Sequence, residues 1–92
     1  MNKTLFEREL EKNLKDPEFK KYYDYYGRQL EIAIQINRLR KQEKMTQTEL
    51  AKKLKTSQSA VARMLAGEQN FSTEMLERIA EVFGKELKIT FV

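Results

Sequence analysis

The chain has 92 residues, with 18 Lys and Arg against 14 Asp and Glu and a net charge of +4 at pH 7. This length accommodates one compact unit. Because the sequence contains neither His nor Cys, it excludes disulfides, zinc sites built on Cys and His, and Ser-His or Cys-His nucleophile pairs. No pair of carboxylates stands out as an acid–base couple. We therefore expect no catalytic site, no metal site and no cofactor.

The basic residues are concentrated in the middle of the chain. Residues 28–66 carry nine basic and three acidic side chains, residues 1–27 carry six of each, and residues 67–92 carry three basic and five acidic. A positive central segment suits a polyanion such as a nucleic acid, although lysines that only solvate a helix face are the alternative. The first 14 residues contain no apolar run that would serve as a signal peptide or membrane span. We therefore expect a soluble, cytoplasmic protein.

The first 27 residues predict an N-terminal helical extension. Thr4 and Glu7 fit a capping box that opens a short helix. The run Asp16-Pro17-Glu18 is typical of the N-cap and first turn of a second helix. The only breaker in the stretch that follows is Gly27, so the second helix is expected to be long, and Gly27 is the position at which it can kink.

Two apolar stripes run along this second helix, about half a turn apart. The later stripe leads into the next region and is expected to join its core. The earlier, aromatic stripe requires a partner, which is the first helix, a second copy or another protein. Tyrosines favour the interface interpretation, with packing on the first helix as the alternative. The earlier stripe contains Phe19, Tyr23, Tyr26, Leu30 and Ile34, with Tyr22 beside it, and the later one contains Ile32, Ile36 and Leu39.

Three shorter helices are expected further along the chain. Thr46-Gln47-Thr48-Glu49 is a second capping box, and Ser57 caps a helix that Gly67 ends. A last amphipathic helix follows Ser72 and stops at Gly84. Every one of these elements is helical, which predicts an all-α fold of about five helices.

The last residues of the chain have a different pattern. Residues 87–92 alternate as a half-buried strand does, but no second strand pattern exists in the chain. We therefore expect residues 85–92 to form a short β-strand that pairs with its mate in a homodimer or extends the sheet of another protein. Ile89 and Phe91 are the expected interface residues of this strand.

Two of the expected helices are separated by a very short turn. The first ends at Leu54 and the second starts at Ser57, which describes a helix-turn-helix with its second helix in the DNA major groove. Ala51 is small where the two helices cross. The second helix has an inward and an outward face: Val61, Met64 and Leu65 point inward, while Gln58, Ser59, Ala62 and Arg63 point outward.

The run Met45–Gly67 resembles the phage-repressor/Cro (XRE) helix-turn-helix family, and the resemblance extends over about Leu30 to Phe83. It implies a phage-repressor-like bundle in residues 28–84, with residues 1–27 as the extension. Two residues depart from the family pattern. Lys55 occupies a turn position where relatives usually have Gly with a positive φ. Glu68 follows the second helix where relatives often carry basic, phosphate-binding residues.

A narrower resemblance comes from the flanking segments. Asp16–Phe19, the Tyr-rich stretch after it and Gly84–Ile89 look like HigA-type antitoxins of type II toxin–antitoxin systems. This resemblance implies that the protein neutralises a small RNA-cleaving toxin of the RelE/HigB kind and represses its own operon. The competing hypotheses are an XRE-family repressor without a toxin partner and a protein-bridging helix-turn-helix module. An enzyme is the least expected function.

Candidate DNA-reading residues lie on the outward face of the second helix. Gln58 can bind adenine N6 and N7 in a bidentate way, Ser59 is a weaker reader, and Arg63 can reach guanine or a phosphate. Gln47 is expected at a phosphate or an outer base. One module reads few base pairs, so a homodimer on a palindromic operator is expected. Candidate backbone contacts, each of which is alternatively a solvated charge, are Arg38, Arg40, Lys41, Lys44, Lys52 and Lys55.

Overall fold

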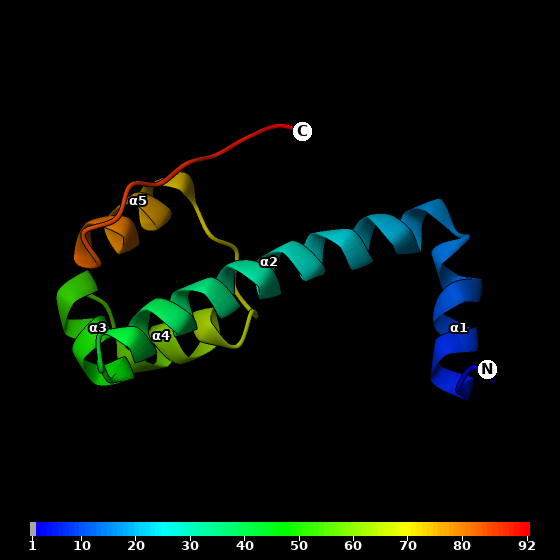
Figure 1. The fold of residues 1–92 in the computed structure, drawn as a ribbon, viewed down its shortest axis with the longest axis horizontal. Coiled ribbons are helices and arrows are strands. Elements are labelled where there is room, and N and C mark those ends of the chain that lie inside the picture. Colours follow the sequence, from blue (N-terminus) through cyan, green and yellow to red (C-terminus); the bar gives the residue numbers. More distant parts are fainter. Residues whose placement is uncertain (1) are drawn as a thin grey trace.

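The computed structural model describes residues 2–92, and Met1, the first residue of the expected extension, lies outside that range. Over the described residues the regular structure is entirely α-helical, in five helices (Figure 1). The all-α class predicted from the sequence is confirmed. The helices are α1 (Leu5–Leu14), α2 (Pro17–Gln42), α3 (Gln47–Leu54), α4 (Gln58–Leu65) and α5 (Thr73–Val82).

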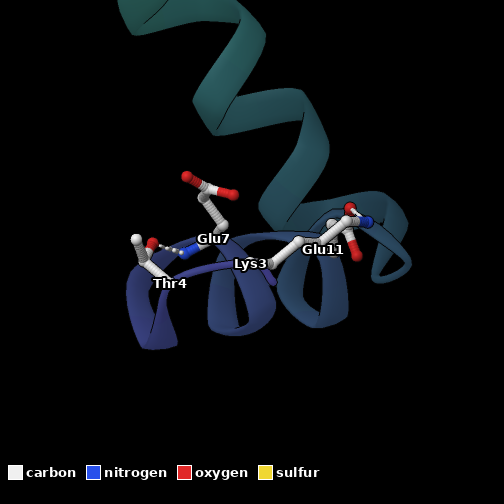
Figure 2. A network of polar contacts seen from close by, with 4 residues as sticks. All are labelled: Lys3, Thr4, Glu7 and Glu11. Atoms are coloured by element: carbon white, nitrogen blue, oxygen red, sulfur yellow. Dashed lines mark hydrogen bonds and ion pairs between the residues drawn. The ribbon is translucent and has the colours of Figure 1, made fainter. Parts of the chain in front are cut away.

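Each helix begins at a short polar side chain that accepts a hydrogen bond from the backbone of the first turn. Figure 2 shows the first of these caps, where the Thr4 hydroxyl accepts from the Glu7 backbone N–H at 3.1 Å. An ion pair joins Lys3, just before this helix, to Glu11 on it. The helix starts predicted from the sequence are therefore confirmed. A short stretch of sequence predicts them because each capping bond joins residues two or three positions apart. The five capping residues are Thr4, Asp16, Thr46, Ser57 and Ser72.

Helix α2 is the longest element and connects two parts of the molecule. It runs for 26 residues without a break, so the boundary expected at Gly27 falls inside one helix. Its C-terminal half packs on the bundle of α3, α4 and α5, while its N-terminal half projects from that bundle and carries α1 at its far end (Figure 1). We call residues 5–30 the arm. Its last residues, Tyr25, Gln29 and Leu30, contact the loop after α4. The arm accounts for the elongated shape, 45 × 27 × 24 Å.

The hydrophobic core lies where the second half of α2 meets α3, α4 and α5. Leu50, Leu54 and Val61 are its largest fully buried side chains. Ile36, from the later stripe of α2, is buried in the same cluster, and the other two members of that stripe, Ile32 and Leu39, are partly buried against it. The expectation that this stripe joins the core is confirmed. Helix α1, in contrast, has no buried residue.

The C-terminal strand expected over residues 85–92 is wrong. Within residues 2–92 the structure contains no strand, and the tail passes over α5 as an extended segment without regular structure (Figure 1). A strand requires a neighbour for its backbone N–H and C=O groups, and residues 2–92 offer none. Leu87 is half-buried in a groove between α2 and α5, whereas Ile89 and Phe91 are exposed.

Candidate nucleic-acid interface

Helices α3 and α4 cross closely, and their contact is made by small and apolar side chains. Leu50 and Val61 are fully buried, and Ala51 is 2% exposed. Lys55 makes the turn between them in the left-handed conformation, with φ 57° and ψ 46°. The Ser57 hydroxyl then starts α4 by accepting from the Ala60 backbone N–H at 3.1 Å. The structure thus has the predicted helix–turn–helix geometry.

Helix α4 separates its buried and exposed residues as the sequence predicts. Val61, Met64 and Leu65 are buried, and the opposite face is open to solvent. On that face the hydroxyls of Ser59 and Ser57 share a hydrogen bond at 3.2 Å. Arg63 forms no ion pair with any of the described residues. The exposed residues of α4, which we call the outward face, are Gln58, Ser59, Ala62 and Arg63.

A network of polar side chains on α2 holds α3 and α4 in place. The Nδ2 group of Asn37 donates to the backbone oxygen of Leu65 at 3.2 Å, and its Oδ1 accepts from Arg40 Nη2 at the same distance. Arg40 Nη1 donates to the backbone oxygen of Met45 at 3.0 Å. Sequence reasoning did not identify Asn37. It lies four residues after buried Ala33, so helical spacing places it on the packed side of α2.

Arg40 therefore takes part in hydrogen bonds that hold the fold together, a role that the sequence did not indicate. It is half-buried, two of its nitrogens bind within the chain, and its Nε is buried without a partner among the described residues. Its assignment as a DNA backbone contact stays a prediction, and the geometry favours an internal role.

Other polar contacts tie neighbouring segments to this frame. Arg78 on α5 donates from Nη2 to the backbone oxygen of Leu54, at the end of α3. The Phe71 backbone N–H donates to Gln29 Oε1 at 3.3 Å, and the Tyr25 hydroxyl donates to Asn70 Oδ1. These two bonds fix the loop after α4 against α2. The structure thus connects α4 and both of its flanking segments to one scaffold.

The remaining candidate residues are exposed, and they are distributed over α2, α3 and the turns on either side of α3. Gln47 is the first residue of α3, and Lys52 lies further along that helix. Arg38 is two residues after buried Ile36, which places it on the opposite side of α2. Glu68, exposed just after α4, adds a negative charge near the outward face. Lys41, Lys44 and Lys55 are also exposed.

Comparison with known proteins supports this geometry. The model of the helix-turn-helix family matches residues 36–89, which is more than half of the chain and includes α3, α4 and α5. No curated protein and no solved structure matches. The match begins inside α2, so the arm lies outside it. Separately, none of the five described helices combines the length and the apolar content that crossing a membrane requires.

Proposed function

Because the chain belongs to the XRE-type helix-turn-helix family of DNA-binding regulators, we propose that it is the antitoxin of a type II toxin–antitoxin pair. In this role it neutralises a RelE/HigB-like ribonuclease and represses its own operon. The observation that carries the proposal is the arm, which projects from the DNA-binding bundle with an aromatic surface that no part of the described chain covers.

The repressor part of the proposal rests on α4. Its outward face is open and begins with Gln58, an amide that can bind adenine in the major groove. Ser59 and Arg63 follow on the same side of the helix. Two copies set about 34 Å apart, one turn of DNA, would place two such faces on the half-sites of a palindrome. The proposal therefore requires that the chain forms a homodimer.

The antitoxin part rests on the aromatic surface of the arm. Tyr22, Tyr23 and Tyr26 are 58%, 46% and 61% exposed, so α1 does not cover them. With Phe19 and Leu30 they line a shallow apolar groove that crosses Gly27, where nothing lies within 4 Å of the missing side chain. Phe19 and Tyr23 stack with ring centroids 6.3 Å apart. Tyrosines combine a large apolar ring with a polar tip, which suits a protein interface.

The position of the arm also suits a protein with two partners. The aromatic part of α2 lies beyond the bundle that contains α4 (Figure 1). A protein bound on the arm would therefore leave the outward face of α4 open for DNA. This separation favours a chain that holds a toxin and an operator together.

A second candidate function, an XRE-family repressor without a toxin partner, is favoured by one observation. Ile32, Ile36, Leu76 and Ile79 line an apolar groove between α2 and α5, bordered by the tail. Exposed Ile89 extends the apolar surface there. A second copy that covered this groove would form a repressor dimer, and the arm would then have no partner protein.

Co-expression with the product of the neighbouring gene distinguishes the two functions. The proposal expects a stable complex with wild-type chain, loss of that complex in the Tyr22→Ser, Tyr26→Ser double variant, and unchanged operator binding by this variant. Leu5→Ser, at an exposed apolar residue of α1 outside the groove that the tyrosines line, is the control and is expected to keep the complex. Operator binding by a chain that never captures the neighbouring protein would favour the repressor alone. DNA binding that depends neither on the salt concentration nor on the base sequence of the DNA would favour a protein-bridging module.

A further inference from the structure

Four of the five helices end in the same backbone motif. The residue after the last turn is left-handed, and the next backbone N–H donates to the carbonyl five residues earlier. These bonds are Met45 to Arg40 (2.9 Å), Thr56 to Ala51 (3.0 Å), Glu68 to Arg63 (3.0 Å) and Lys85 to Ala80 (2.8 Å). The left-handed residues are Lys44 (φ 53°), Lys55 (φ 57°), Gly67 (φ 74°) and Gly84 (φ 61°).

Glycine is the residue that this conformation favours, because a side chain on Cβ crowds the following carbonyl oxygen. Gly67 and Gly84 follow the rule at the ends of α4 and α5. Lys44 and Lys55, on either side of α3, adopt the same left-handed conformation although they are not glycine. The same cap is therefore made twice by glycine and twice by a residue that is less stable there.

Within residues 2–92, neither lysine side chain forms a hydrogen bond that would offset this strain. Both lysines are exposed, and neither forms an ion pair with any of residues 2–92. Lys55 also lies in a notch with Lys53, Arg78 and a single carboxylate, Glu81. Three cations around one acid repel one another, and a bound anion would relieve that repulsion.

We propose that Lys44 and Lys55 bind DNA backbone phosphates at the two ends of α3. The proposal rests on the DNA-binding function and selects two of the exposed cations for this role. An eight-residue helix is about 12 Å long, and the major groove is about 12 Å wide. Lys44 lies two residues before the N-cap of α3 and Lys55 directly follows the helix, so the two lysines flank a span comparable to the groove width. The proposal places their ammonium groups at phosphates on the two sides of the groove that α4 enters.

The test is the replacement of each lysine by glycine, which removes the ammonium group and relaxes the cap. Lys44→Gly and Lys55→Gly are expected to raise the melting temperature of the full chain by a few degrees. Each is expected to weaken binding to operator and to unrelated duplex by the same factor. The slope of log K against log salt should become shallower by about 0.9 per substitution. Stability and affinity thus change in opposite directions.

Two further variants make the result decisive. Lys55→Arg keeps the charge and should keep the salt slope. Gly84→Lys places a lysine in the matching cap of α5, where the added Cβ has nothing within 4 Å, and should lower the melting temperature without steepening the slope. Wild-type affinity and slope in both glycine variants, or lower melting temperatures, would overturn the inference. A wild-type chain without salt-dependent DNA binding would instead overturn the proposed function.

Discussion

The side-chain amide of Asn37 donates a 3.2 Å hydrogen bond to the backbone oxygen of Leu65, which joins α2 to the last turn of α4. The oxygen of the same amide accepts from Arg40, which in turn donates to the Met45 backbone just before α3. One half-buried network therefore sets both helices of the DNA-binding unit relative to α2.

Replacing Asn37 by Ala should destabilise the protein because it leaves the Leu65 carbonyl and the Nη2 group of Arg40 without a partner, while Arg40 Nη1 keeps its bond to Met45. The expected loss in the free energy of unfolding is about 1–3 kcal/mol, measured by urea denaturation. Gln35→Ala, at an exposed amide on the same helix, is the control and should change stability by less than about 0.5 kcal/mol. Equal effects of the two substitutions would contradict a structural role for Asn37.

Arg40→Lys tests whether this residue acts inside the fold or on DNA. A lysine cannot reproduce the two separate bonds to Asn37 and Met45, so we expect a loss of about 1–2 kcal/mol in unfolding free energy although the charge is kept. Lys41→Arg, at the exposed neighbour, should leave stability unchanged. If Arg40→Lys had wild-type stability, the anchoring role would be wrong.

Ala51→Leu should disrupt the crossing of α3 and α4. Ala51 is 2% exposed, and a larger side chain there overpacks the contact, with an expected cost of about 1–3 kcal/mol. Ala62→Leu makes the same change on the exposed side of α4. It should leave thermal unfolding unchanged and weaken operator binding. A stable Ala51→Leu variant with normal DNA affinity would show that the close crossing is unnecessary.

Gln58→Ala should reduce discrimination at one base pair in each half-site by about 1–3 kcal/mol and leave the other positions unchanged. The measurement is binding to a set of operators that differ by single base pairs. Gln69→Ala, at an exposed amide in the loop after α4, is the matched control and should retain full discrimination. A uniform loss of affinity over all operators would assign Gln58 to the DNA backbone instead.

Sequence patterns predicted the features that depend on neighbouring residues. Thr46 and Ser57 cap their helices through backbone groups three residues away, and helical periodicity separates the buried Val61 from the exposed Ala62. The left-handed turn at Lys55 was also expected, from the resemblance to a family that usually has glycine there. These interactions span one or two turns of helix, so a short stretch of sequence contains all the groups that form them.

The tertiary structure alone decided the features that join distant parts of the chain. Asn37 meets Leu65 across 28 residues, and Arg40, a candidate DNA contact by sequence pattern, makes two bonds within the chain. The alternating tail was expected to form a strand, but the chain provides no second edge for it. Local pattern sets which conformation a segment prefers, whereas the partner that satisfies a polar group or covers an apolar face comes from elsewhere in space. The sequence by itself therefore determined the helices and the outward face of α4, and only the assembled fold determined how that face is held.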